Sequence, residues 1–319
     1  MHLPGGILDQ GPCIVTGVIA AAALGYAVYR LRREMNPGVA PRMAVTAAVV
    51  FAAQMVNYPV SGGISGHVLG GVLAVTLLGP WAGLLAMSVV LVVQCLLFQD
   101  GGLSALGANV LNMGVVGALG GYGVYAFVRQ RLGGPRGAIV GSVVASWLAV
   151  MVGALFCAVE FASGGKVGLI AAISAMLPVH AMIGAGEAAV TGLVVALMVK
   201  MQPELIYDPQ RPVALARTGR SIWAGLAIAL AVAAFVSPWA SSFPDGLESS
   251  LTRLHAEPVH VPFELSSPLS NYQFPYVANA AAGGAVAGLL GTLIVFVAVG
   301  AIAWPLPRRD VRRPIQQGR

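Results

Sequence analysis

The sequence predicts an all-α, polytopic membrane protein with about nine transmembrane helices, seven of them in one bundle and two in a C-terminal hairpin. Of its 319 residues, 57% are hydrophobic and only 9% are charged, and the mean hydropathy is +0.82. Soluble domains carry roughly 25% charged residues. So few charges cannot solvate the surface of a 32.6 kDa chain. Most of that surface is therefore expected to face membrane lipid.

The second observation is a series of nine apolar stretches bounded by Pro, Gly and charged residues. They run at 13–29, 43–59, 67–78, 81–98, 103–128, 137–159, 169–199, 222–240 and 278–304. Most approach the roughly 20 residues that a helix needs to cross a bilayer. The third stretch is too short for a regular crossing, so we expect a broken or re-entrant helix there.

The basic residues predict the orientation in the membrane. If the N-terminus lies outside, only Lys166 and Arg253 fall on the outer side. All other Lys and Arg residues then lie inside: Arg30, Arg32, Arg33, Arg42, Arg129, Arg131, Arg136, Lys200, Arg211, Arg217, Arg220, Arg308, Arg309, Arg312, Arg313 and Arg319. Cytoplasmic loops carry an excess of such residues, so we expect the N-terminus outside and the C-terminus in the cytoplasm. Because the charges flank apolar segments, the net charge of +6 does not indicate a nucleic-acid partner.

A proline-containing linker predicts two modules. We expect a helical bundle over 1–204, a cytoplasmic linker over 205–221, and over 222–319 a two-helix hairpin that ends in a basic cytoplasmic tail. The outer loop of the hairpin, 241–276, is rich in Pro and Ser and lacks helical periodicity, so we expect an irregular loop.

That outer loop is acidic on the side from which a cation would arrive. Against Arg253 it carries Asp245, Glu248, Glu257, Glu264, His255 and His260. Such a loop can raise the local concentration of cations or bind them transiently. The alternative is that a solvated loop is simply polar.

The first two residues offer an unusual set of metal ligands. No Lys or Arg occurs within 1–11, which argues against a signal peptide, and the bulky His2 disfavours removal of the initiator methionine. We therefore expect the mature chain to begin with Met1. The Met1 amine, the His2 amide nitrogen and the His2 Nδ1 can then form fused chelate rings around one ion.

A second outer histidine can complete this set. His67 lies in a Gly-rich stretch just before the short third segment, and its imidazole would give a planar N4 set that suits Ni(II) or Cu(II) and, less strictly, Co(II). Taken alone, His2 is weak evidence for a metal site, and a histidine in a Gly-rich turn is usually just a turn residue.

His180 and Glu187 are the ionisable side chains that lie well inside an apolar run. They are seven residues apart and share one helix face. An intramembrane charge is a functional candidate, so one hypothesis is an intramembrane enzyme that uses this pair. The other is a polar contact between helices. The sequence lacks the GxxxxGK[ST] nucleotide loop, so in an active transporter another subunit must hydrolyse ATP.

The first apolar stretch carries Gly17, Ala21 and Gly25 at four-residue spacing. Small residues in such a stripe let another helix approach closely. The stripe serves either internal packing or contact with a partner protein.

Four blocks of sequence, in order, resemble a known family. They are Met1–Leu8 (MHLPGGIL), Gln54–Val60 (QMVNYPV), Ser65–Gly71 (SGHVLGG) and Phe98–Gly114 (FQDGGLSALGANVLNMG). Over about 1–200 the chain is similar to the CbiM/NikM cobalt and nickel uptake proteins, the substrate-capturing S components of energy-coupling factor (ECF) transporters. Residues Phe243–Glu248 (FPDGLE) resemble the PDGLE segment that is fused to, or encoded beside, such proteins.

The resemblance implies ligands and supporting residues. It implies that Met1, His2 and His67 bind the metal, and that Gln99, Asp100, Asn109 and Asn112 hold the N-terminal segment and hydrogen-bond the ligands. For these four, helix capping and interhelical hydrogen bonding remain the alternative. The family usually has an acidic or polar residue where Gly5 stands, so a local carboxylate is missing here while the chelate stays intact.

The resemblance also implies a function and partners. It implies import of Ni²⁺ or Co²⁺ as the transported substrate, with no catalytic cofactor and no enzymatic activity of the chain itself. The partners would be a transmembrane coupling (T) protein and two ATP-binding cassette ATPases, in the cytoplasmic membrane of a bacterium or archaeon. The planar N4 set and the PDGLE-type tail favour nickel. A self-sufficient metal permease is the alternative within the transport class.

Overall fold

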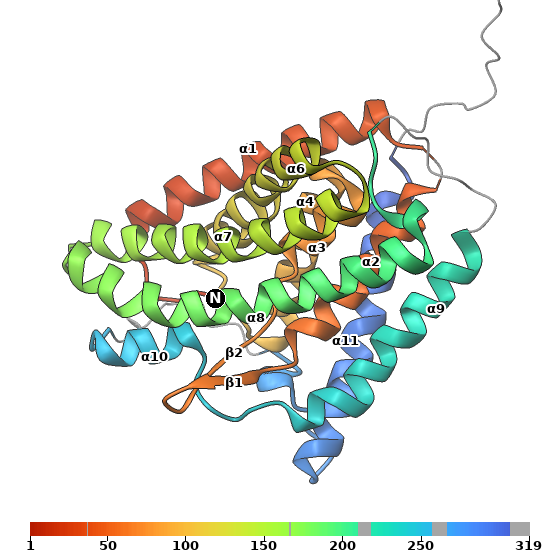
Figure 1. The fold of residues 1–319 in the computed structure, drawn as a ribbon. Coiled ribbons are helices and arrows are strands. Elements are labelled where there is room, and N and C mark those ends of the chain that lie inside the picture. Colours follow the sequence, from red (N-terminus) through yellow and green to blue (C-terminus); the bar gives the residue numbers. More distant parts are fainter. Residues whose placement is uncertain (37, 166, 210–217, 257–266, 307–319) are drawn as a thin grey trace, which may run out of the picture.

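The computed structural model describes residues 1–36, 38–165, 167–209, 218–256 and 267–306. Its elements bear out the predicted all-α class (Figure 1). The helices that form the body are α1 (Gln10–Glu34), α2 (Val39–Gln54), α3 (Gly71–Leu78), α4 (Pro80–Val93), α5 (Leu106–Asn109), α6 (Gly121–Leu132), α7 (Gly134–Ser163), α8 (Leu169–Met201), α9 (Thr218–Ala231), α10 (Gly246–Arg253) and α11 (Ala280–Ala303). A two-stranded antiparallel hairpin, β1 (Tyr58–Ser61) and β2 (Ile64–Gly66), lies between α2 and α3.

Seven helical segments of the described chain are long and apolar enough to cross a membrane. They are Gln10–Glu34, Pro80–Phe98, Leu106–Leu132, Gly134–Ser163, Leu169–Met201, Gly219–Trp239 and Ala280–Ala303. The two remaining predicted stretches also form helices, but α2 has 16 residues and α3 only eight. Eight residues extend about 12 Å, far less than the ~30 Å of a hydrocarbon core. The third stretch is therefore a broken element, as its length suggested.

The break before α3 is held by a buried carboxylate. Gly70 has a φ of 74°, which ends the extended chain, and the backbone N–H groups of Leu69 and Gly70 both donate to Glu187 of α8, over 2.6 and 2.9 Å. Gln54 donates to the carbonyl of Leu69 over 2.7 Å. Irregular backbone at membrane depth needs such partners within the protein. Glu187 thus serves as a cap for α3.

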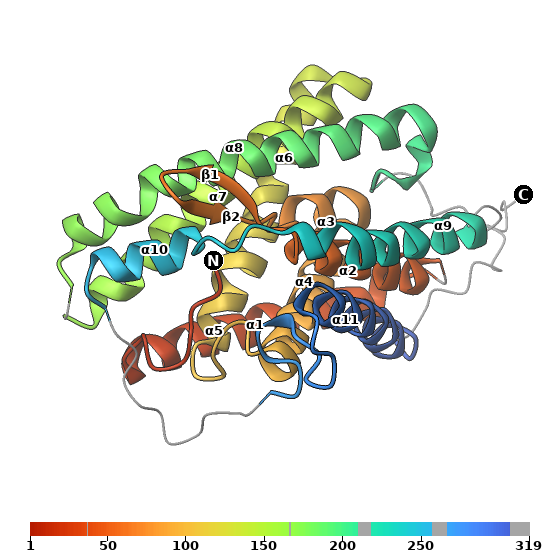
Figure 2. The same cartoon turned by 90° about the horizontal axis from the view of Figure 1, so that it is seen from below.

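The two predicted modules contact each other through several helices. Helices α9 and α11 pack against α2, while α10 packs against α8 and β2 (Figures 1 and 2). The outer loop is less irregular than expected, because α10 forms within it. Its start carries a reciprocal capping box between Asp245 and Glu248. This is a local signal for a helix start that does not depend on hydrophobic periodicity.

Several sequence predictions fall on residues outside the described ranges. These are the middle of the linker (210–217), the loop residues Glu257, His260 and Glu264, Lys166, and the basic residues at 211, 217 and 308–319.

Replacing Glu187 with alanine tests the cap. The variant leaves two buried N–H groups without an acceptor, and each such group costs roughly 1–3 kcal/mol, so we expect a clear fall in the thermal midpoint of the detergent-solubilised protein. Glu34→Gln is the matched control, because Glu34 pairs with Arg30 at an exposed position where an ion pair contributes little. Equal midpoints for the two variants would contradict the capping role.

Candidate metal-binding site

The N-terminal segment folds back among the helices, as Figure 2 shows. Met1 is 4% exposed and Leu3 is fully buried. The Leu3 N–H donates to Asn109 Oδ1 over 2.7 Å, and Asn109 Nδ2 donates back to the Leu3 carbonyl over 3.1 Å. Gly102 N–H donates to the same carbonyl over 2.8 Å. The Asn109 side chain therefore binds the N-terminal segment through both its amide oxygen and its amide nitrogen.

A close approach of two backbones explains the glycines of this region. A Cβ on Gly102 would lie 2.0 Å from the nitrogen of Gly5 and 2.2 Å from its Cα, so no side chain fits there. The neighbouring Gly101 has a φ of 87°, in the region that favours glycine. The loop after α4 can thus lie directly against residues 3–6.

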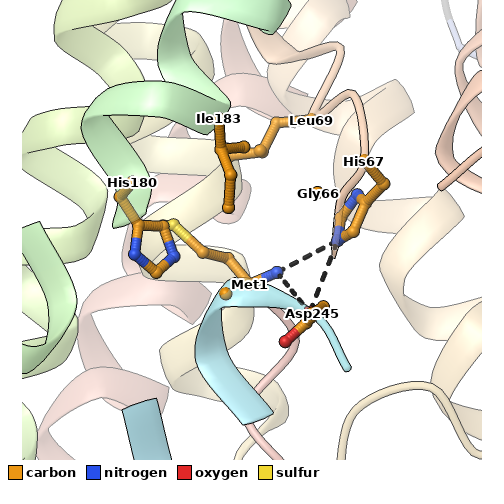
Figure 3. Close-up of a pocket in the computed structure, with 8 residues that line it drawn as sticks. Met1, Gly66, His67, Leu69, His180, Ile183 and Asp245 are labelled. Atoms are coloured by element: carbon orange, nitrogen blue, oxygen red, sulfur yellow. Dashed lines mark hydrogen bonds and ion pairs between the residues drawn. The ribbon is translucent and has the colours of Figure 1, made fainter. Parts of the chain in front are cut away.

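Two of the four predicted donor nitrogens meet in a small cavity (Figure 3). The Met1 amine lies 3.0 Å from His67 Nε2. This is close to the separation of two neighbouring donors that each bind one ion at about 2.0–2.1 Å and a right angle. Nδ1 of His67 lies 3.1 Å from the carbonyl of Val68, which favours a proton on Nδ1 and leaves the lone pair on Nε2.

His2 lies beside this pair and contacts Asp100. Its ring stacks on that of His67, with centroids 5.3 Å apart and planes 17° apart. Its Nδ1 lies 3.1 Å from Asp100 Oδ1, while Asp100 Oδ2 accepts a 2.5 Å hydrogen bond from Tyr272. Asp100 thus orients one predicted ligand. His2 Nε2 is buried without a hydrogen-bond partner among the described residues.

Burial sets the protonation of these groups. Burial and the N-terminal ammonium lower the pKa of His2 to about 3, and the same causes, with His2 added, lower the pKa of His67 to about 3. Both imidazoles are therefore neutral at pH 7, the form that binds metals. Burial raises the pKa of Asp100. Burial alone would also raise the pKa of Asp245, but the N-terminal ammonium and His67 outweigh it and hold that pKa well below its usual range.

Two predicted supporting residues do not reach the ligands. Gln99 is exposed, has a φ of 57°, and makes no side-chain hydrogen bond within the described part of the chain. The amide that lies nearby in the core is that of Gln94, which donates to Gln54 and to Tyr272. Asn112 donates to Glu160 of α7 over 2.8 Å, so it joins two helices.

Two contacts at the site come from the C-terminal part and have no clear signal in the sequence. Asp245 Oδ2 lies 3.5 Å from the Met1 amine and 3.9 Å from His67 Nε2, although this residue was predicted only as one of several loop charges. Tyr272, which no motif singled out, binds Asp100. The one local signal for Asp245 was its place in the FPDGLE segment.

His180 and Glu187 do not form a pair. His180 Nδ1 bonds the Met176 carbonyl over 2.7 Å, its Nε2 is buried without a partner among the described residues, and its ring lines the cavity beside Met1. Glu187 instead binds backbone N–H groups. Within the described ranges, no three His, Cys, Asp or Glu side chains form a group that could hold a metal.

Comparison with known proteins assigns both parts of the chain. Residues 2–205 match the family model described as "Cobalt uptake substrate-specific transmembrane region", and residues 219–308 match the PDGLE domain. A protein of Archaeoglobus fulgidus, provisionally named fused nickel transport protein NikMN, is 35% identical over 92% of this chain and 95% of its own length. The fused nickel transport protein NikMN of Rhodobacter capsulatus is 33% identical over 94% of this chain and 96% of its own.

A solved structure described as a truncated transition metal transporter is also similar. It aligns with a TM-score of 0.57 and 32% identity over 63% of this chain and 99% of that chain. The intramembrane-enzyme hypothesis for His180 and Glu187 is thereby wrong, because the family and the relatives are transporters.

Replacing Asn109 with alanine tests how the N-terminal segment is held. The Leu3 N–H loses its buried acceptor, so we expect the amides of residues 1–9 to exchange with deuterium roughly 10-fold faster or more, since each 1.4 kcal/mol is a factor of ten. The control is Asn279→Ala, which removes the cap of α11 and should leave these amides unchanged. Unchanged exchange in Asn109→Ala would show that Gly102 alone holds the segment.

Proposed function

The chain belongs to the family of cobalt uptake substrate-specific transmembrane regions and carries a PDGLE domain, and on that premise we propose that it captures Ni(II) on the outer side of the cytoplasmic membrane for ATP-driven ECF import. It is a membrane component of nickel or cobalt transport and not an enzyme. In the proposal, the Met1 amine, the amide and imidazole of His2, and the imidazole of His67 bind the ion.

The burial of the N-terminal amine against His67 carries this proposal. A chain end is normally hydrated, and burying a charged or polar group costs free energy unless it is paired. Here Asn109 and Gly102 hold the first residues so that the amine lies 3.0 Å from His67 Nε2. An ion that displaces one proton of the N-terminal ammonium would bind the freed amine nitrogen and His67 Nε2 together.

Closing the full chelate requires one local change. Nδ1 of His2 contacts Asp100, so the imidazole must turn about its Cβ–Cγ bond to bind the same ion as the amine. Four nitrogens in a plane suit Ni(II) better than Co(II). The relatives named as nickel transport proteins support the same choice.

Partners and orientation complete the proposal. Because the sequence has no nucleotide-binding loop, a transmembrane coupling protein and two ATPases supply the energy, with the N-terminus outside and the C-terminus in the cytoplasm of a bacterium or archaeon. The alternative is a self-sufficient permease. Uptake by cells that contain this chain without any coupling protein or ATPase would favour the permease.

Extending the N-terminus tests the chelate. One residue placed before Met1 converts the amine into an amide, so we expect Ni(II) affinity to fall by more than the roughly 10- to 100-fold that changes around a metal site usually cost. His67→Ala should act similarly, whereas His180→Ala should retain binding. Affinity is measured by competition with a chelating dye, after mass spectrometry has established that the reference chain begins with a free Met1. A C-terminal extension of equal length is the control, and unchanged affinity in the extended protein would refute the chelate.

The small-residue stripe of α1 tests the coupling. Its members differ in surroundings: Gly17 packs against Gly107 of α5, whereas Ala21 and Gly25 are exposed and a Cβ on Gly25 would meet no atom within 4 Å. Gly25→Leu should therefore fold normally and keep its Ni(II) affinity while uptake in cells with the partner subunits falls, because the partner helix can no longer approach. Ala224→Leu, on the exposed face of α9, is the matched control. Normal uptake in Gly25→Leu would remove α1 from the coupling surface.

A further inference from the structure

The carboxylate of Asp245 faces the two donor nitrogens that meet in the cavity. Its Oδ2 lies 3.5 Å from the Met1 amine and 3.9 Å from His67 Nε2 (Figure 3), and the side chain is 18% exposed. We propose that Asp245 of the PDGLE domain is a metal ligand that completes the site on the CbiM-type domain. This inference rests on the proposed function, because it takes the amine and His67 as ligands of the same ion.

The structure fixes the direction of this carboxylate. Oδ1 accepts the N–H of Glu248 over 2.8 Å, and Glu248 Oε2 accepts the N–H of Asp245 over 3.0 Å. This capping box occupies one carboxylate oxygen and leaves the other directed at the amine. A charged side chain used only as a helix cap would not need burial beside an N-terminal amine and an imidazole.

The loop that carries Asp245 is docked on the bundle by several contacts. Ser65 of β2 donates its N–H to the Pro244 carbonyl over 2.9 Å and its hydroxyl to the Phe243 carbonyl over 2.7 Å. Leu247 is 1% exposed in the core around Met1. A Cβ on Gly246 would lie 2.5 Å from Ile183 Cδ1 and 2.9 Å from Val179 Cγ1, so a larger residue there would force these side chains of α8 to shift. The carboxylate is thus presented by a packed element.

The distances permit coordination after a small movement. The amine and His67 Nε2 are 3.0 Å apart, the spacing of neighbouring ligands, and Oδ2 lies only about half to one ångström farther from each of them. Rotation of one side chain covers this difference. When an ion lies between the nitrogens, Oδ2 can bind it from the side that the planar nitrogen set leaves open, and Ni(II) and Co(II) accept such an additional ligand.

Charge balance favours the same assignment. A divalent ion held by neutral imidazoles, a neutral amine and a deprotonated amide retains one positive charge. Burying that charge without a partner is costly. The Asp245 carboxylate neutralises it. It differs in this respect from the exposed carboxylate of Glu248, whose effect on the ion would be a field that salt screens over about 10 Å.

The experiment compares Asp245→Asn with Glu248→Gln in the full-length protein. Asparagine caps helices as well as aspartate does, so Asp245→Asn keeps α10 and removes the ligand. Glutamine retains the acceptor at 248 and removes an exposed loop charge. We expect Asp245→Asn to lower Ni(II) affinity about 10-fold or more, at both 50 and 500 mM salt, and to remove one oxygen from the Ni(II) ligands seen by X-ray absorption. Glu248→Gln should change neither quantity.

Two results would overturn the assignment. One is an unchanged affinity and ligand set in Asp245→Asn. The other is an equal loss in both variants that disappears at 500 mM salt, because that behaviour belongs to a long-range field. The thermal midpoint of each metal-free variant verifies folding, and Asp245→Ser, which also caps helices, provides a second variant with the same expected loss.

The N-terminally extended protein separates this inference from the proposed function. If the extended protein binds Ni(II) like the unmodified chain, the chelate is wrong and the inference falls with it. If the extended protein loses binding while Asp245→Asn does not, the chelate stands and the role of Asp245 is wrong.

Discussion

The burial of the chain's own N-terminus is the constraint on which the rest of the site depends. A terminal amine that leaves water must find partners, and here those partners are His67 Nε2 and Asp245 Oδ2. Two hydrogen bonds between the backbone of Leu3 and the side chain of Asn109 hold the N-terminal segment in place. Gly102 allows the supporting loop to touch it. Without these contacts the amine would be one more hydrated chain end.

The site also depends on a break in the regular backbone. His67 lies in an extended stretch between β2 and α3, where its ring can face the amine and stack on His2. Such a break exposes N–H groups, and Glu187 and Gln54 satisfy the backbone groups of Leu69 and Gly70. The intramembrane carboxylate therefore supports the conformation beside His67 and takes no part in chemistry of its own.

Residues of both domains lie at the candidate site. The PDGLE domain contributes Asp245, which contacts the Met1 amine directly, and Tyr272, which binds Asp100 beside His2. Helices α9 and α11 of this domain pack on α2, and α10 packs on α8 (Figures 1 and 2). The exposed face of α1 thus remains available for the proposed partner subunits while the hairpin covers another face.

Features that depend on adjacent residues or on a local hydrophobic pattern could be predicted from the sequence alone. The apolar stretches gave helices in every predicted place, the length of 67–78 revealed its break, and the chelate donors of Met1 and His2 follow from their adjacency in the chain. His67 was a candidate from its predicted position on the same side of the membrane as His2, and the resemblance pointed to Asn109 and Asp100. All of these depend on order along the chain, which a sequence displays directly.

The tertiary structure decided the contacts between residues far apart in the chain. Asp245 and Met1 are 244 positions apart, and Glu187 binds the backbone of Leu69, 118 positions before it. Gln99 was expected near the ligands, but it is exposed with a φ of 57°, and the buried glutamine of this region is Gln94. Such pairs depend on how helices pack and on which side chain each turn directs inward. Neither helix packing nor the direction of a side chain follows from the spacing of residues along the chain, because packing depends on how many side chains from distant segments fit together.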